Sequence, residues 1–379
     1  MKRFFQPAAQ VIRFFLSLDL SNQLNRIVMK RWNLAFALIG LLLLTCTSED
    51  NGLSSQDVLE VDMSDFYVQT DESADLYKTD GEEKNRNCHT MAVLNRQLQE
   101  NPGLYRKMYD IEKHTRAFIA SKRPDGAGNG NGNNGGDPGG GGGDPVDDGL
   151  GSINIPVYIY VIYSNDLQNI SDQQINSQIT VLNNDFNDTN YNDVPAEFQP
   201  VGADIDIHFT LGVVNRIYDS TSSWGTNDSV KSKYPAQTGY LTIWVCNIGG
   251  GILGYAQFPG GKASTDGIVV SPQYFGTTGY VSAPFDGGRT ATHEIGHWLN
   301  LRHIWGDGRC RQDDFVADTP TSDRPNYRCP SYPTVHCQSN DMTMNYMDYT
   351  DDACMNMFSQ GQKERMRALF AAGGVREGL

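Results

Sequence analysis

The sequence predicts an α/β fold, of the mixed α+β kind, over residues 153–379. An alternating apolar stretch at 153–162 is followed by a helical pattern from residue 172 and by strand-like stretches at 204–213 and 241–246. Beyond residue 303 little periodicity appears before residue 360, and four cysteines lie in this part. We therefore expect a twisted mixed sheet backed by helices, above an irregular, disulfide-bonded lower subdomain.

The chain is acidic, with 45 Asp and Glu against 30 Lys and Arg and a formal net charge of −15. Nucleic acids bind basic surfaces, so this balance argues against DNA or RNA as a partner. It favours a soluble surface.

Residues 1–46 are interpreted as an export leader. The apolar run at 34–44 is too short to span a bilayer and fits the core of a signal peptide. Met29 stands directly before a basic pair and is the expected true start. Cys46 closes the run as in a bacterial lipoprotein signal, which predicts a lipid anchor as the one membrane attachment. Thr45 departs from the usual small residue, so the location is either the bacterial cell surface, as an outer-membrane lipoprotein, or secreted.

Three segments precede the main domain. Residues 47–87 are polar and acidic and are expected to form a tether of low order. Residues 88–123 carry two helical patterns separated by Asn101-Pro102, and this pair is too small to fold well alone. Residues 124–152 are rich in Gly, Asn, Asp and Pro and are expected to be a flexible linker. The basic stretch 121–124 just before the linker is suited to proteolytic cleavage.

The main domain opens with the strand at 153–162. The next helix begins after Ser171, which with Gln174 forms a predicted capping box, while Ile170 and Ile175 form a hydrophobic staple. In the strand at 241–246, Cys246 is expected to be a buried free thiol. Residues 254–257 are a candidate exposed edge strand for an extended peptide, with an ordinary hairpin as the alternative.

The most informative stretch of the sequence is 293–303. His293 and His297 lie four residues apart, so on a helix they share one face and can bind one metal ion. His303 supplies a third imidazole, and Asn300 suits the left-handed turn that presents it. Three protein ligands with an open fourth position are typical of catalytic zinc, and Glu294 can act beside the metal without binding it.

These residues resemble the extended zinc motif of the metzincin metalloproteases. The turn Asn345–Tyr349, with Met347 at its centre, resembles the methionine turn beneath the zinc in those enzymes. The wider run 344–366, together with the stretches 254–259, 305–308 and 317–320, is similar to the pappalysin family, and within it to the ulilysin-like members. The resemblance covers roughly residues 153–370 and implies a metzincin, zincin-like catalytic domain.

The resemblance implies a zinc endopeptidase that acts on protein or peptide substrates. Glu294 is expected to activate a zinc-bound water and to pass its proton to the leaving amine. Tyr349 is expected to donate to the oxyanion, or else to be a packed aromatic in the turn. Asp352 is expected in the pocket for the residue after the scissile bond (P1′), which favours Arg and then Lys; the alternative is a solvated turn residue. Gly254 and Tyr255 are expected to bind substrate.

Cys88 stands ahead of the helical pair and resembles the cysteine of the pappalysin pro-region, although His89 replaces the usual Gly. A thiolate is a strong zinc ligand, so the resemblance implies a cysteine switch in a zymogen. The alternative is an unpaired cysteine with no role or one that pairs between molecules.

The resemblance also implies the disulfides Cys310–Cys337 and Cys329–Cys354, although four cysteines by themselves allow three pairings. It implies a calcium site near Asp314 and Thr319, with a solvated acidic loop as the alternative. Two other functions stay open at this point: a non-catalytic surface binding protein on the same scaffold, and a zinc hydrolase of non-peptide amides.

Overall fold

The structure is a computed structural model that describes residues 60–68, 85–122, 147–187 and 194–379. The expected leader, with Met29 and Cys46, and most of the expected linker lie outside these ranges. No helix within the described ranges is long and apolar enough to cross a membrane.

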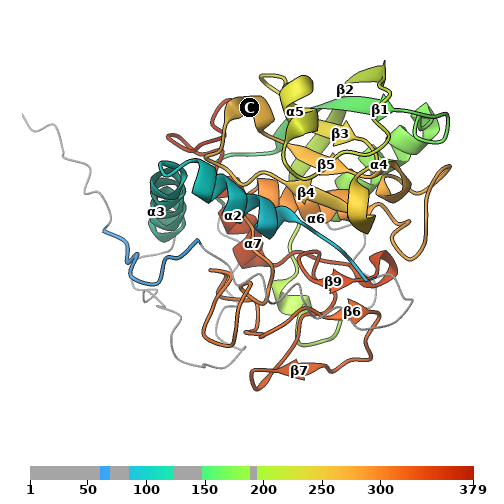
Figure 1. Ribbon diagram of the computed structural model, residues 1–379. Coiled ribbons are helices and arrows are strands. Elements are labelled where there is room, and N and C mark those ends of the chain that lie inside the picture. Colours follow the sequence, from blue (N-terminus) through green and yellow to red (C-terminus); the bar gives the residue numbers. More distant parts are fainter. Residues whose placement is uncertain (1–59, 69–84, 123–146, 188–193) are drawn as a thin grey trace, which may run out of the picture. The chain divides into compact units, whose positions relative to one another are not determined.

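A mixed five-stranded sheet forms the upper part of the domain, with strand order β2-β1-β3-β5-β4 (Figure 1). The first four strands in this order run parallel to one another, and the edge strand β4 pairs antiparallel with β5. The α/β prediction is thereby confirmed. The bounds are β1 Ile153–Tyr163, β2 Ile207–Tyr218, β3 Leu241–Val245, β4 Gly254–Ala256 and β5 Ile268–Val270.

The second strand begins three residues later than expected and runs further. Asp206 has a φ of 55°, which interrupts extended backbone directly before Ile207. From there the strand follows β1 to its end at Tyr218, with one register shift beside Val157.

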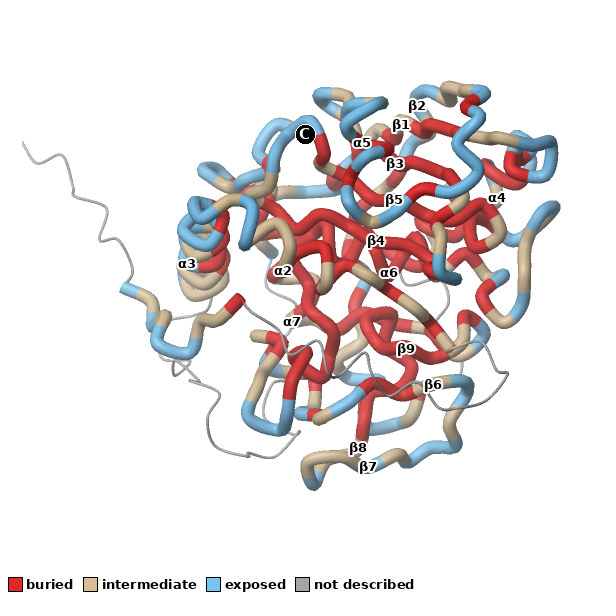
Figure 2. Tube along the Cα trace, in the orientation of Figure 1, coloured by how far each residue is buried: buried red, intermediate tan, exposed pale blue. Residues whose placement is uncertain are grey.

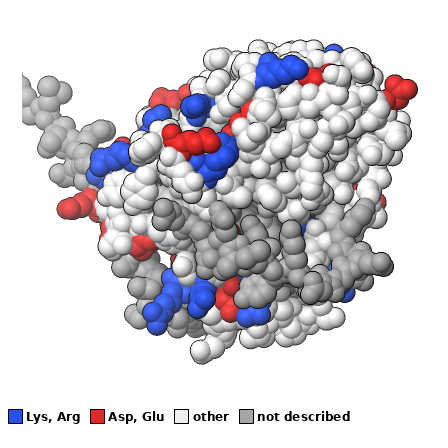
Figure 3. Space-filling view, viewed as in Figure 1, with Lys and Arg blue, Asp and Glu red and all other residues white. Residues whose placement is uncertain are grey.

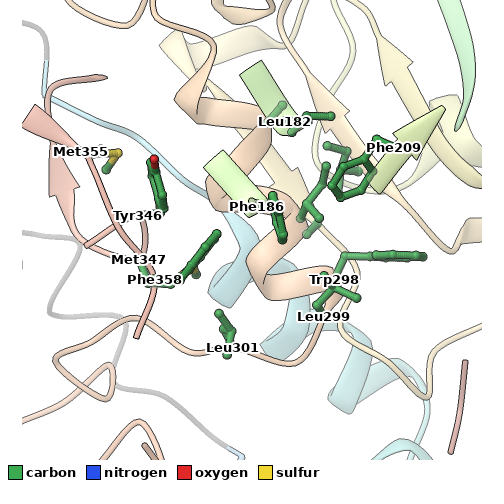
Figure 4. Packing of buried hydrophobic residues seen from close by; sticks show 14 of the residues in the cluster. Leu182, Phe186, Phe209, Trp298, Leu299, Leu301, Tyr346, Met347, Met355 and Phe358 are labelled. Atoms are coloured by element: carbon green, nitrogen blue, oxygen red, sulfur yellow. The ribbon is translucent and has the colours of Figure 1, made fainter. Parts of the chain in front are cut away.

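Two helices cover one face of the sheet. α4 (Asp172–Phe186) and α6 (Arg289–Trp298) pack on the side towards which the odd-numbered residues of β1 point. Figure 4 shows Phe186 of α4 between Phe209 of β2 and Phe358, with ring centroids 5.0 and 4.9 Å from its own. The opposite face carries a smaller core that includes Tyr160, Trp244 and Val230 of α5 (Ser229–Lys233). The strands β3, β4 and β5 and nearly all of α6 are buried, whereas much of the edge strand β2 is exposed or half-buried (Figure 2).

Ser171 caps α4 as predicted, because its side chain accepts from the Gln174 N–H at 3.1 Å. The second bond of the predicted capping box, from the Ser171 backbone N–H to the Gln174 side chain, does not form. The Gln174 amide instead donates to the carbonyls of Pro272 and Phe275, at 2.9 and 2.8 Å. This side chain braces the loop before α6, a role that no local pattern indicates.

The two predicted N-terminal helices are α2 (Thr90–Glu100) and α3 (Leu104–Lys122), separated at Asn101. Both pack on the domain formed by residues 153–379, as do residues 60–68 and 85–87. The expectation of an unpacked tether therefore does not hold for those two stretches. α3 lies against α7 (Gln360–Ala368), where Glu112 forms a buried ion pair with Arg365 at 2.7 Å.

The lower part is irregular, as expected, and its helical and extended pieces are short. Disulfides join Cys310 to Cys337 and Cys329 to Cys354, the two pairings that the resemblance implied. The remaining strands are β6 Tyr327–Arg328, β7 Val335–His336, β8 Ser339–Asn340 and β9 Tyr349–Thr350, and the 3₁₀ turns are Gln199–Val201, Gly249–Gly251, Ala263–Thr265, Pro272–Tyr274 and Asp352–Cys354.

The described charges are interspersed on the face seen in Figure 3, where basic and acidic side chains lie next to one another. Several form ion pairs, such as Arg96 with Asp228 and Arg116 with Asp65.

Candidate active site

The helix α6 holds two of the three predicted metal-binding histidines on one buried face. It ends at Trp298, and Asn300 then adopts a φ of 71°, the left-handed conformation that the sequence predicts. This turn brings His303 back beneath the helix. The sequence forms the site locally, because all three imidazoles come from eleven consecutive residues.

The three Nε2 atoms converge. His303 Nε2 lies 3.3 Å from that of His293 and 3.1 Å from that of His297. The Sγ of Cys88 completes the group, 3.7 Å from His297 Nε2, and the four ligand atoms lie within 4.8 Å of one another. A tetrahedral zinc with ligands at 2.0–2.3 Å requires separations of about 3.3–3.8 Å, so this donor set fits zinc.

The other ring nitrogens are held by the protein. His293 Nδ1 donates to the Tyr346 carbonyl at 2.7 Å and His297 Nδ1 to the Leu301 carbonyl at 2.8 Å. His303 Nδ1 contacts the Asp307 carboxylate. Burial, and then the neighbouring imidazoles, lower the pKa of His293 and His297 well below the ordinary value. Both rings are therefore neutral, with their Nε2 lone pairs aimed at the common centre.

Glu294 lies beside this centre and is fully buried. Burial raises its pKa to about 7, although the Thr90 hydroxyl donates to it at 2.6 Å. A pKa near neutrality suits a group that must take up and release a proton. Gly254 of β4 makes the close approach possible, because a Cβ there would meet the Val269 carbonyl oxygen at 2.9 Å and Glu294 Cγ at 3.1 Å.

Met347 packs directly beneath the active-site helix. A Cβ at Gly296 would lie 2.3 Å from its Sδ, so the helix needs glycine at this position. Two residues further on, the ring of Tyr349 packs against His303 with centroids 4.9 Å apart. Its hydroxyl donates to the Cys88 carbonyl at 3.4 Å, so it faces the same space as the metal ligands.

The segment before α2 crosses this space as an added strand. It bridges to the sheet edge in the parallel direction, with the Leu253 N–H donating to the Asn87 carbonyl at 3.1 Å and the His89 N–H to the Gly254 carbonyl at 3.2 Å. The main chain at the predicted edge strand is thus paired within the molecule. The Tyr255 side chain is fully buried in the core on the opposite face, so only its backbone belongs to the site.

Asp352 lies at the end of the site, 2% exposed. One carboxylate oxygen accepts from the N–H groups of Gly287 and Arg289, at 2.9 and 3.1 Å. The other receives the guanidinium of Arg86 at 2.5 Å. The carboxylate is therefore held rigidly from one side and binds a cation on the other.

The sequence profile of the peptidase M43 family, described as pregnancy-associated plasma protein-A, matches residues 225–371. The extracellular metalloprotease 1 of Coccidioides posadasii is 34% identical over 232 residues, which are 58% of this chain and 77% of that protein.

Solved structures are similar too. Mature mirolysin of Tannerella forsythia in complex with a cleaved peptide is 44% identical, with a TM-score of 0.58 over 60% of this chain and 95% of that one. A promirolysin mutant from the same organism is 37% identical, with a TM-score of 0.65 over 77% of this chain and 96% of that one.

The chain belongs to the peptidase M43 (pappalysin) family. It is therefore a metalloendopeptidase with the metzincin fold, as the sequence predicts. Membership decides against a non-catalytic binding protein and against a hydrolase of non-peptide amides.

In this M43 peptidase the calcium candidates do come together. Asp314 is buried, and both its oxygens accept from the Thr319 hydroxyl, at 2.9 and 2.8 Å. Burial, and then the Asp313 charge, raise the pKa of Asp314 well above its ordinary value. A second cluster, Cys310 and Cys337 with Asp323, is no metal site because its two cysteines form a disulfide.

Sequence reasoning missed three contributors to the site: Arg86, Thr90 and Asp307. Asp307 lies four residues after His303, a spacing that could have indicated a carboxylate that orients the ring. Arg86 and Thr90 flank Cys88 at two residues on either side, and their partners lie more than 200 residues away. No local signal could have found those partners.

Proposed function

We propose that this M43 peptidase is made as an exported zymogen, whose residues 85–122 block a zinc endopeptidase site. The observation that carries the proposal is the alternation of Arg86, Cys88 and Thr90. These three side chains, two from the stretch before α2 and one from its first residue, each contact one functional group: the Asp352 carboxylate, the histidine cluster and Glu294. Extended backbone directs alternate side chains such as those of Arg86 and Cys88 to one face, and Thr90 at the start of α2 adds the third contact, so one short segment covers the whole site.

The Cys88 thiol is the proposed fourth zinc ligand of the latent form. Burial, and then the Glu294 charge, raise its pKa well above the ordinary value, so it is a protonated thiol in the absence of metal. A bound cation reverses that preference and favours the thiolate. The promirolysin match supports a pro-segment, since it covers 77% of this chain against 60% for the mature form.

Zinc, when bound, supplies the Lewis acid that polarises the scissile carbonyl and acidifies a water molecule. Glu294 accepts the proton of the attacking water and returns it to the leaving amine. Tyr349 donates its hydroxyl to the oxygen that becomes negative, at the position where it now donates to the Cys88 carbonyl. β4 binds the substrate main chain through Gly254 and Tyr255 once the pro-segment has left.

We propose that the pocket at Asp352 selects Arg, and then Lys, as the residue after the scissile bond. Arg86 supports this, because its guanidinium enters the pocket as a substrate side chain would. Its Nε donates to the Thr350 carbonyl at 3.1 Å and its planar group lies 5.0 Å from the centre of the Phe285 ring. A planar cation gains from both contacts, whereas an ammonium does not match this geometry.

The remaining proposals concern the ends of the molecule and a second metal. Relatives named extracellular metalloproteases support export, and Cys46 is the proposed lipid anchor. Activation is proposed at Ser121–Lys122 or Lys122–Arg123, which fits the same Arg and Lys preference.

Calcium is proposed at Asp314 and Thr319, because a buried carboxylate with a raised pKa is better satisfied by a cation than by a proton alone. We also propose that, within the pappalysin family, this chain is similar to the ulilysin-like members.

The test of the function is a digest of a denatured protein by the purified, activated enzyme, with mapping of every new terminus by mass spectrometry. We expect cuts with Arg and Lys on the leaving side, loss of all cuts after zinc chelation, and recovery on adding zinc. Cuts that persist in the chelated enzyme would contradict a metal mechanism. A flat preference on the leaving side would contradict the pocket.

A further inference from the structure

Residues 60–68 bridge two parts of the protein. On one side they are fixed to α3, where Arg116 pairs with Asp65 at 2.6 Å. Phe66 packs edge-on against the Tyr109 ring of the same helix at 5.6 Å, and Val68 is 1% exposed. Val68 is thus part of a small apolar core and Phe66 packs against it, whereas the polar side chains of the segment stay exposed.

On the other side Tyr67 enters a site on the catalytic part, just beyond the third histidine. Its hydroxyl hydrogen is shared between the carbonyl oxygens of Gly306 and Asp313, each at 2.8 Å. Its oxygen accepts from the Asp313 N–H at 3.1 Å. Burial raises the pKa of Tyr67 to about 12, so the phenol remains a donor. Main-chain groups of one loop therefore surround the hydroxyl with acceptors and a donor.

Arg302 closes this site. Its guanidinium lies 4.2 Å from the centre of the Tyr67 ring and 4.5 Å from that of Phe315, and it donates to the Tyr67 carbonyl. The residue is 6% exposed, and no carboxylate of the described residues forms an ion pair with it. Its Nη1 also has no hydrogen-bond partner among them. A buried cation in this position depends on the aromatic faces and carbonyl that a bound tyrosine supplies.

We propose that Arg302, Phe315 and the loop 306–313 form a tyrosine-binding site, and that Phe66–Val68 is its built-in ligand. The ligand class is an extended peptide that presents a tyrosine side chain. Its ring stacks on the Arg302 guanidinium, its hydroxyl hydrogen-bonds to the loop 306–313, and the residues before it contact α3. In the zymogen the site is a second anchor that holds the pro-segment independently of Cys88. This regulatory role rests on the proposed function, whereas the binding site itself does not.

The binding site is tested without catalysis, in the full chain carrying Glu294→Gln. Tyr67→Ala empties the site, and a fluorescent nonapeptide with the sequence of residues 60–68 is titrated by anisotropy. We expect this peptide to bind the emptied chain and not the chain with Tyr67 intact. The same peptide with Tyr67→Phe should bind roughly tenfold more weakly or worse, because a buried loop then loses its partner. Phe315→Ala should weaken binding of the tyrosine peptide.

The regulatory role is tested in the otherwise unaltered chain. Tyr67→Phe should shorten the time to activation severalfold and leave kcat/KM of the activated enzyme unchanged. Tyr105→Phe is the matched control, since that exposed tyrosine contacts the same Phe66 ring. Equal affinity of the two peptides, or no binding to the emptied chain, would overturn the site. Specific peptide binding with unchanged activation times would overturn the anchor alone, and absence of any proteolysis with intact binding would count against the proposed function instead.

Discussion

At the scale of single residues, Glu294 has the environment of a proton carrier. It is buried against Gly254, its pKa is raised to about 7, and it lies beside the cluster of Cys88 and three histidines without belonging to it. Glu294 can therefore act as a base without being a metal ligand. A substitution that keeps the shape and removes the charge should therefore abolish turnover and leave the metal bound.

We expect Glu294→Gln to lower kcat roughly 10²–10⁴-fold with zinc still near one ion per chain. Metal analysis and peptide hydrolysis are measured on the same sample, and His297→Ala serves as the variant that should lose zinc. If the glutamine variant also lost zinc, Glu294 would be a ligand and the proposed mechanism would be wrong.

A second prediction at this scale concerns Asp352. Removing its charge in Asp352→Asn should lower kcat/KM for substrates with Arg after the scissile bond roughly 10–100-fold, because a hydrogen bond to a charged partner is worth about 1.5–3 kcal/mol. Substrates with an apolar residue there should change little. Asp351→Asn is the control for loss of a nearby negative charge. An unchanged cleavage profile in Asp352→Asn would mean that the carboxylate has no contact with substrate.

At the scale of elements, α3 is held on α7 by a buried ion pair. Burial by itself would raise the pKa of Glu112, but Arg365 and Arg116 lower it from the ordinary 4.5 to about 2. A carboxylate whose pKa is lowered by folding stabilises the folded form above its ordinary pKa. That contribution is complete above 4.5 and is lost as the pH falls towards 2.

Glu112→Gln should therefore loosen α3, because it leaves the buried guanidinium of Arg365 without a carboxylate, while Arg116 keeps only its pair with Asp65. The expected cost is about 3–5 kcal/mol of docking free energy. In an inactive Glu294→Gln background, hydrogen exchange of α3 should rise near neutral pH, and its acid dependence between 4.5 and 2 should flatten. Asp110→Asn, in an exposed pair on the same helix, should change neither. Unaltered protection of α3 in the glutamine variant would show that apolar contacts alone dock the helix.

At the scale of the whole molecule, the proposed latency depends on several contacts of one pro-segment. Cys88→Ala should remove the proposed zinc ligand while Arg86 and Thr90 keep their partners. We expect either activity before any cleavage or activation at least severalfold faster than in the parent. Time-resolved electrophoresis and peptide hydrolysis measure cleavage and activity. Cys246→Ala, which removes a buried free thiol directly after β3, is the control for loss of a cysteine. A Cys88→Ala chain as latent as its parent would leave steric cover by α2 and α3 as the sole cause.

The sequence by itself determined the features that arise within a few residues of one another. Helical spacing places His293 and His297 on one face, and Asn300 at a φ of 71° returns the chain to His303. Alternation in 153–162 gives a strand whose odd-numbered side chains are buried from Ile153 to Val161, and a serine at position 171 starts α4. These results depend on local backbone geometry, which periodicity and residue type encode directly.

Only the tertiary structure decided which distant residues meet. Arg86 and Asp352 are 266 positions apart, and Tyr67 reaches a loop more than 230 residues away. The Gln174 side chain follows its tertiary partners and not the helix start, since buried carbonyls of the loop before α6 need donors. Local patterns carry no record of such contacts, because burial and hydrogen-bond demand arise only once the sheet, the helices and the N-terminal segment have packed together.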